Sequence, residues 1–288
     1  MKSIYKTPQA KSVLMRLYDE KLNSLNIDYK EIDVNTTFGK TRVIKAGNEK
    51  AKKIVIFHGL NAGSPLTLEA VKDLRDDYLL IAIDTIGQAT KSEENPINIK
   101  DDSYAVWADE VLDQLEITDA HFIGISYGAF ILQKLITHRP AKVSKCIFVV
   151  PGGLVNGTLG ESMRRLTLPL IKYQITKKDS HLKDFIKAFV PDGDEFMFRM
   201  QKALLTGFKM DYRRPVLLKE KDVENFTNPV YMIVADDDVF FPGDAAIKRA
   251  EKLFQNIQGT HVLKNSKHMP SFDTYPEIQQ KIKSWIEE

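Results

Sequence analysis

The sequence of 288 residues has few of the features that mark secreted, membrane-spanning or nucleic-acid-binding proteins. It has one cysteine, Cys146, which excludes an internal disulfide, and the apolar neighbours of this residue indicate a packed thiol rather than a reactive one. No apolar run approaches the length of a membrane span, and the start Met1–Lys6 is not followed by an apolar stretch of signal-peptide length. We therefore expect a soluble, cytoplasmic protein without stable membrane association.

The sequence also lacks an excess of charge of either sign. The 41 Lys and Arg residues nearly balance 39 Asp and Glu residues, a formal charge of +2, so no nucleic-acid or anionic-membrane partner is expected. The histidines lack H-E-x-x-H or a similar ligand spacing, and no Walker or G-x-G-x-x-G loop is present. We predict no metal and no cofactor.

From Lys53 onward, short apolar runs rich in β-branched residues alternate with helical stretches. This alternation predicts an α/β fold with a mostly parallel sheet whose two faces are covered by helices. Residues 8–25 have leucines at helical spacing, which favours a helix packed on the domain over a membrane or partner contact. The predicted strands, of which the first two form a hairpin, are Glu31–Thr36, Thr41–Ala46, Ile54–Phe57, Leu79–Ile83, Ala120–Ile125, Val143–Val150, Val230–Ala235 and His261–Leu263. The predicted helices between them are Leu68–Leu74, Ser103–Leu115, Tyr127–Thr137, Asp244–Gln255 and Glu277–Glu287.

The alternation is interrupted once, between Gly152 and about Phe226. This stretch contains only helical pieces, Ser162–Ile175, Leu182–Phe189 and Glu195–Leu205. It therefore predicts a helical insertion between two strands of the sheet. The chain divides accordingly into a first core segment (1–151), an insertion (152–226) and a second core segment (227–288).

The strongest local motif is Gly124-Ile125-Ser126-Tyr127-Gly128, between a predicted strand and a predicted helix. Glycines two residues on either side of a serine let a sharp strand-to-helix turn form without Cβ clashes, and the hydroxyl then projects above the sheet. This context favours Ser126 as a nucleophile over a serine that merely caps the helix.

A serine hydroxyl needs a base to accept its proton. Of the six histidines, His268 follows the last predicted strand through Lys264–Lys267 and precedes the final helix, at the sheet edge where open α/β sheets place functional groups. We expect His58 to order its own loop. The remaining histidines lie in or near strands, at a helix end or in the insertion: His121, His138, His181 and His261.

The base needs a carboxylate to fix its tautomer, and Asp236-Asp237-Asp238 ends the strand Val230–Ala235. Three adjacent carboxylates are a poor choice for packing alone, although a solvated acidic turn is the alternative. We predict that Asp236 points beside the sheet or orders the turn, that Asp237 reaches solvent, and that Asp238 lies clear of the sheet, where it orients the base.

The loop from His58 to Pro65 follows the strand Ile54–Phe57 and contains two glycines. The backbone N–H of Leu60, together with that of Tyr127, would supply the two donors of an oxyanion hole. A generic strand–helix loop is the alternative.

The order Ser126, Asp238, His268 resembles the α/β-hydrolase superfamily. The His58-Gly59 loop, the Asp84–Gly87 segment with Ser92, and the spacing from Asp238 to Pro242 are also similar to it. The similarity covers most of the chain and is closest to capped bacterial carboxylesterases. It implies an eight-stranded, mostly parallel sheet with a helical cap after the sixth strand, and a structural role for Asp84. The sequence departs from the family at Ala235 and Lys267, where glycines are usual, and Lys267 would place a cation beside the base.

The resemblance and an apolar cap together predict a carboxylic-ester hydrolase that works through an acyl-enzyme on small to medium apolar acyl or aryl esters. The alternatives are a thioester, amide-like or carbon–carbon bond cleaved by the same residues, or a non-catalytic small-molecule-binding module. Epoxide hydrolases and haloalkane dehalogenases use an aspartate where this chain has Ser126. We expect most large apolar cap residues to form the cap core and a minority to contact the ligand: Met163, Tyr173, Phe185, Phe189, Phe196, Met197, Phe198, Met200 and Phe208.

Overall fold

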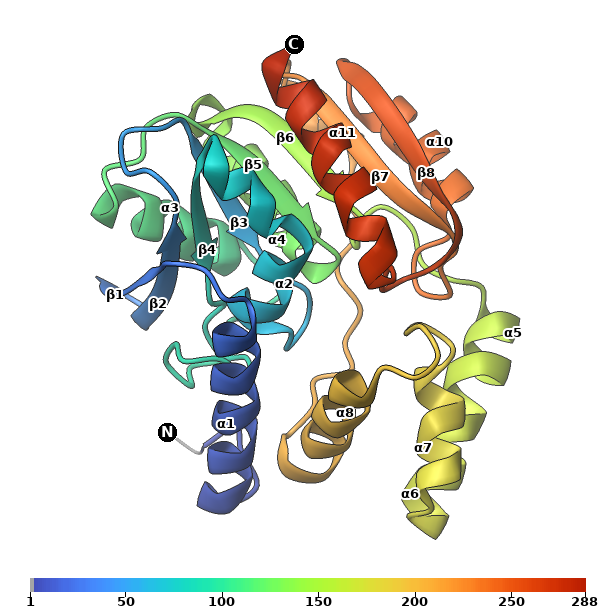
Figure 1. Ribbon diagram of the computed structural model, residues 1–288. Coiled ribbons are helices and arrows are strands. Elements are labelled where there is room, and N and C mark those ends of the chain that lie inside the picture. The colour runs from blue at the N-terminus through green and yellow to red at the C-terminus, as the bar shows by residue number, and fades with distance from the viewer. Residues whose placement is uncertain (1–2) are drawn as a thin grey trace.

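A computed structural model describes residues 3–288. Met1 and Lys2 lie outside the described residues; they begin the predicted first core segment and the start for which we expected no signal peptide. Its centre is a sheet of eight strands in the order β1-β2-β4-β3-β5-β6-β7-β8 (Figure 1). β1 pairs with β2 and β2 with β4 in antiparallel fashion, and all other neighbours are parallel. The strands are β1 (Lys30–Thr36), β2 (Gly39–Ala46), β3 (Lys53–Phe57), β4 (Leu79–Ile83), β5 (Ala120–Ile125), β6 (Val143–Val149), β7 (Val230–Asp237) and β8 (Ile257–Lys267).

Helices cover both faces of the sheet, and each face has its own apolar cluster. The strand side chains alternate between the two clusters, because successive residues of a strand point to opposite faces. On one face lie α2 (Gly63–Val71), the 3-10 helix η1 (Lys72–Asp76) and α11 (Tyr275–Glu287). On the other lie α3 (Ser103–Gln114), α4 (Tyr127–His138), α9 (Glu220–Val223) and α10 (Gly243–Leu253). Two further 3-10 turns are η2 (Pro140–Lys142) and η4 (Phe272–Thr274).

A helical insert follows β6 and lies beyond the carboxyl ends of the parallel strands (Figure 1). A π-helical turn interrupts its first helical run, which was predicted as one regular helix. Pro169 explains the irregularity, because proline has no backbone N–H to donate to the carbonyl four residues earlier, as a regular helix requires. The insert comprises α5 (Leu159–Ser162), the π-turn η3 (Met163–Thr167), α6 (Leu168–Thr176), α7 (Asp179–Ile186) and α8 (Glu195–Gly207).

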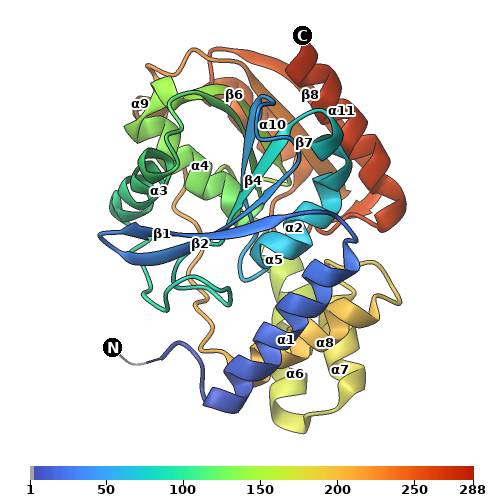
Figure 2. The same ribbon diagram turned by 60° about the vertical axis from the view of Figure 1, so that its left-hand side comes forward.

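The first helix, α1 (Pro8–Ser24), joins the insert to the sheet. Its Tyr18 and Leu22 pack in the cluster under α2 and α11, whereas Leu14 and Leu17 pack in the cluster of the insert. Figures 1 and 2 both show α1 beside α8, and a backbone bridge joins Tyr5 to Phe208 just after α8. The predicted packing of this helix on the domain is therefore observed. Within residues 3–288, no helix is both long enough and apolar enough to cross a membrane.

The predicted fold, a mostly parallel eight-stranded sheet with a helical insert after the sixth strand, is confirmed. Three predicted elements differ from prediction by at least three residues at both ends: β8, α2 and α7, of which α7 spans Asp179–Ile186 rather than Leu182–Phe189. β8 runs from Ile257 to Lys267 rather than from His261 to Leu263, because it is an edge strand whose exposed polar residues hide the strand pattern. α2 already begins at Gly63, and a 3-10 helix replaces its predicted last turn.

Candidate active site

Ser126 lies in the turn between β5 and α4, and its backbone is strained, with φ 54° and ψ −113°. A Cβ on Gly128 would lie 2.0 Å from the carbonyl oxygen of Phe57, and one on Gly124 would lie 2.6 Å from the Cα of Ala129. Neither position therefore accepts a side chain. The glycine spacing of the motif exists because backbone passes on both sides of this turn.

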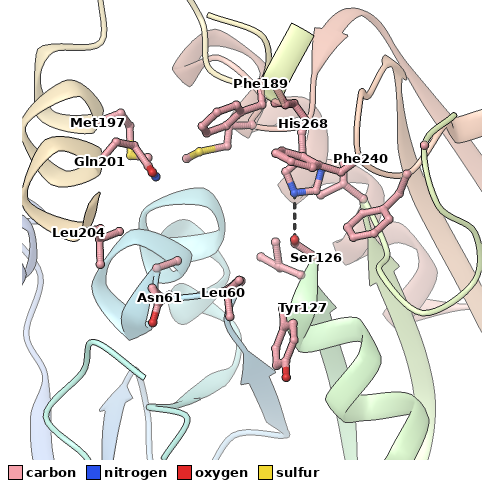
Figure 3. A pocket seen from close by; sticks show the side chains of 18 of the residues that line it. Leu60, Asn61, Ser126, Tyr127, Phe189, Met197, Gln201, Leu204, Phe240 and His268 are labelled. Carbon is pink, nitrogen blue, oxygen red and sulfur yellow. Dashed lines mark hydrogen bonds between the residues drawn. The ribbon is translucent and has the colours of Figure 1, made fainter. Parts of the chain in front are cut away.

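The structure joins Ser126, His268 and Asp238 in one hydrogen-bonded chain. The Ser126 Oγ and the His268 Nε2 are 2.9 Å apart, and the His268 Nδ1 and the Asp238 Oδ2 are 2.7 Å apart (Figure 3 shows the first of these bonds). The side chain of Asp238 is fully buried and that of His268 is 9% exposed. A carboxylate only accepts, so the Nδ1 carries the proton and the Nε2 is free to accept from the serine.

The three adjacent aspartates have three different partners. Asp238 accepts from the backbone N–H groups of Phe240 and Phe241 at 2.8 and 3.0 Å as well as from His268. Asp236 accepts from the N–H groups of Asn265 and Ser266 at 2.9 and 3.0 Å, so it binds the neighbouring strand β8 rather than the turn that follows β7. Asp237 was predicted to be a solvent-facing carboxylate. Although half-exposed, it forms an ion pair with a side chain of the insert.

The segment before His268 is not the simple loop that we predicted. The register between β7 and β8 jumps from Ala235–Leu263 to Asp237–Lys267, which leaves Lys264–Ser266 as a bulge in β8. The bulge pairs Lys267 with Asp237. The next residues, His268 and Asp238, therefore lie next to each other where the two strands end. The Lys267 ammonium group does not turn to the imidazole, as the sequence suggested, but binds the carbonyl of Val190 and the carboxylate of Asp192.

His58 and Asp84 form the framework beneath the site. The backbone N–H of Thr85 donates to the His58 Nε2 at 2.8 Å, so the His58 Nδ1 carries the proton and donates to the Gly59 carbonyl. Burial lowers the pKa of His58 and keeps it neutral, although Asp84 and the Gly59 carbonyl oppose this shift. Asp84 accepts from the Tyr18 hydroxyl and from the backbone N–H of Ser64. Both residues therefore order the loops around them, as predicted.

The loop at Leu60 packs directly against Ser126. A Cβ built on Gly59 would lie 3.5 Å from the Ser126 Cβ, and the Ala62 N–H closes a turn to the Gly59 carbonyl at 3.0 Å. Asn61 in this turn has a φ of 53°, which is typical of a type II turn. Within residues 3–288, the amides of Leu60 and Tyr127 have no hydrogen-bond acceptor.

The site opens into a cavity of about 660 Å³ between the sheet and the insert. Four of the nine cap residues that we singled out line it, namely Phe185, Phe189, Met197 and Met200. Tyr173 and Phe208 belong to the core of the insert, and Met163 is exposed. Sequence reasoning missed further lining residues in the insert and near Asp238 and His268: Leu166, Leu170, Leu204, Phe240 and Met269. Figure 3 shows Leu204 and Phe240 among them.

Charged groups are few in this cavity. The charged lining residues in the described chain are Asp211, Arg213 and Arg214, all exposed on the segment that follows α8. The guanidinium of Arg213 binds the Asp211 carboxylate and holds the pKa of that carboxyl below its usual range, although partial burial opposes this effect. Residues 3–288 contain no group of three or more His, Cys, Asp or Glu side chains placed to hold a metal ion.

Comparisons with known proteins agree with the fold described above. A model of the α/β-hydrolase fold matches residues 52–227, more than half of the chain. Carboxylesterase YbfK of Bacillus subtilis (strain 168) is 21% identical over 280 residues, which cover 93% of this chain and 92% of the relative. The crystal structure of naproxen esterase (carboxylesterase NP) from Bacillus subtilis superposes with a TM-score of 0.81 at 20% identity, and the match covers 98% of this chain and 99% of that one. A 2-hydroxy-6-oxononadienedioate/2-hydroxy-6-oxononatrienedioate hydrolase of a Pseudomonas species is 30% identical over 164 residues, 55% of each chain.

Proposed function

The chain belongs to the α/β-hydrolase fold family and is a distant homologue of Bacillus carboxylesterases, and on this premise we propose that it is a serine esterase with Ser126 as nucleophile, His268 as base and Asp238 as the orienting acid. The hydrogen-bonded chain from Ser126 through His268 to Asp238, at the floor of an apolar cavity, is the observation that carries the proposal. Residues 152–226 form a cap over this site.

In the first half of the reaction, the Ser126 Oγ attacks the ester carbonyl while the His268 Nε2 takes the hydroxyl proton. The imidazolium that forms is stabilised by the buried carboxylate of Asp238, which two backbone N–H groups hold in place. His268 then protonates the leaving alcohol, and an acyl-enzyme remains on Ser126. In the second half, His268 activates a water molecule that cleaves this acyl-enzyme.

The N–H groups of Leu60 and Tyr127 stabilise the negative oxygen of each tetrahedral intermediate. Donors fixed by the fold need no reorganisation at the moment of reaction, and one such donor contributes roughly 10² to 10³ in turnover. The Leu60 donor is held by its neighbour, because the Asn61 N–H donates to the Gln88 Oε1 at 2.6 Å and the Asn61 Oδ1 accepts from the Ala89 N–H at 3.1 Å.

The substrates that suit this cavity are carboxylic esters with uncharged acyl or aryl groups of small to medium size. The walls near Ser126 are apolar and aromatic, so burial of apolar substrate surface contributes to binding. Met197 and Met200 of α8 add side chains that adapt to different shapes.

A second candidate is the hydrolysis of a dicarboxylate, because one relative is named for dioate substrates. The charges of the cavity argue against it. A dianion needs fixed cations, whereas Arg213 is already paired with Asp211 and Arg214 is exposed. An aryl butyrate and the matched aryl hemisuccinate separate the two candidates: we expect faster hydrolysis of the neutral butyrate, and a preference for the hemisuccinate would favour the dicarboxylate. Aryl phosphates should not be cleaved.

Exposure to a fluorophosphonate followed by mass spectrometry tests the nucleophile without assuming a substrate. We expect one adduct on Ser126, none in Ser126→Ala, and normal labelling in the control Ser284→Ala on the exposed side of α11. Folded protein that is not labelled, or an adduct on Ser64, Ser92 or Ser271, would contradict the proposal.

A further inference from the structure

Three consecutive carbonyl groups of the insert, those of Ala188–Val190, accept hydrogen bonds from groups around the acid and the base. The Ala188 carbonyl accepts from the Arg165 guanidinium at 3.1 Å. The Phe189 carbonyl accepts from the backbone N–H of Met269 at 2.9 Å, and the Val190 carbonyl accepts from the Lys267 ammonium at 3.1 Å. Met269 and Lys267 are the two residues that flank His268 in the sequence. The insert therefore holds the base from both sides.

Arg165 extends this network to the acid. Its guanidinium binds the Asp237 carboxylate through two nitrogens at 2.5 and 2.9 Å, and Asp237 precedes Asp238. Arg165 lies in the π-helical turn η3, whose wider turn interrupts the regular helix. Asp237 raises the pKa of Arg165, which therefore stays charged. One side chain thus joins η3, the segment after α7 and the turn of β7 that ends in the acid.

Aromatic contacts follow the same path from the insert to the imidazole. Phe189 packs against Phe240 with ring centroids 5.3 Å apart, and Phe240 packs edge-on against His268 at 5.0 Å. Figure 3 shows these three rings side by side, above Ser126. A shift of the Ala188–Val190 segment would therefore be passed to the imidazole ring through Phe240.

We infer that Arg165 is a positioning residue for His268: through Asp237 and the Ala188 carbonyl it fixes the insert to the turn that carries the acid, and so keeps the base in line with Ser126. The inference rests on the proposed function of the triad and adds to it that the insert, beyond covering the cavity, completes the alignment of the base.

The direct energy of the ion pair cannot explain a large effect, which makes the inference testable. Arg165 and Asp237 are 21% and 49% exposed, and pairs of this kind contribute little to stability. Misplacement of a catalytic group by about 1 Å, however, can cost about 10²-fold in rate. We therefore expect Arg165→Met to lower kcat about tenfold, with a KM within about twofold of the wild-type value and little change in melting temperature.

The experiment compares the wild type with Arg165→Met, Arg165→Lys, Asp237→Asn and the double variant, using an aryl ester and fluorophosphonate titration of active sites. Arg164→Met is the matched control, because Arg164 binds Glu161 on the outer surface of the insert. The control should equal the wild type, and Arg165→Lys should be intermediate, because an ammonium group cannot form the two-nitrogen contact. The double variant should lose no more than the worse single variant, since both changes break one contact.

Several outcomes would overturn the inference: a wild-type kcat per titrated site in Arg165→Met, a loss confined to KM, or losses that multiply in the double variant. If Arg165→Met does not fold, Arg165→Lys and Asp237→Asn answer the same question. Failure of the proposed function gives a different result, because the wild type itself would then carry no adduct on Ser126.

Discussion

The three neighbouring aspartates allow one class of substitution to give three distinct outcomes. Asp238→Asn keeps the volume of the side chain but places an N–H₂ donor opposite the His268 Nδ1, which at present donates to the carboxylate at 2.7 Å. The imidazole must then carry its proton on the Nε2, where it cannot accept the hydroxyl proton of Ser126. Turnover should fall by about 10⁴, which corresponds to about 5.4 kcal/mol of transition-state stabilisation.

Asp236→Asn should act on stability instead. Each carboxylate oxygen of Asp236 accepts one backbone N–H group of the β8 bulge, so in Asp236→Asn one of these two N–H groups faces an N–H₂ donor and loses its acceptor. We expect a loss of about 1 kcal/mol and a melting temperature lower by about 2 °C, with turnover within a few-fold of the wild-type value. Partial burial raises the pKa of Asp236, but the two N–H groups hold it below its usual range. Its contribution is therefore present at neutral pH and is lost as the pH falls through its folded-state pKa.

The test compares Asp236→Asn, Asp237→Asn and Asp238→Asn by their rates per titrated active site and their melting temperatures. It decides which aspartate orients the base. The expected order of kcat is Asp236→Asn close to the wild type, Asp237→Asn about tenfold lower and Asp238→Asn about 10⁴-fold lower. If Asp238→Asn turns over normally while Asp236→Asn or Asp237→Asn is inactive and folded, the assignment of the acid is wrong.

Two further predictions concern the framework of the site. Gly128→Ala should destabilise the protein by more than about 3 kcal/mol or prevent folding, because its Cβ would lie 2.0 Å from the Phe57 carbonyl oxygen. Gly160→Ala is the control in a melting experiment. A Cβ there has no neighbour within 4 Å, so the stability should not change. Because burial lowers the pKa of His58 in the folded state, stability should fall as the pH drops below the unfolded value of about 6.5, by up to about 1.4 kcal/mol per pH unit. Melting curves between pH 7 and pH 5 should show this decline and a smaller one in His58→Gln; equal slopes would contradict the role of His58.

The parts of the fold that the sequence predicted are those in which burial dictates residue type. The inner strands β3 to β7 are buried on both faces, so they appear as apolar runs, and their positions agree with prediction to within two residues. β8 is an edge strand with alternating exposed residues and a bulge, and only His261–Leu263 were recognisable. In the insert, helical spacing predicted helices, but not the π-helical turn before Pro169 or the side chains that face the cavity.

The same distinction explains which parts of the site were predictable. Ser126, Asp238 and His268 each directly follow a strand, and the carboxyl ends of parallel strands meet at one edge, so strand positions alone bring them together. The partner of Asp237 could not be found in this way. Alternation along β7 predicts that Asp237 points away from Asp236 and Asp238, but not what covers that side. The covering residue, Arg165, lies 72 positions earlier in an insert whose placement depends on the packing of α1 and α8. The positions of the reacting groups therefore follow from strand geometry. Their alignment depends on contacts from a segment distant in the sequence, and these contacts leave no local sequence pattern.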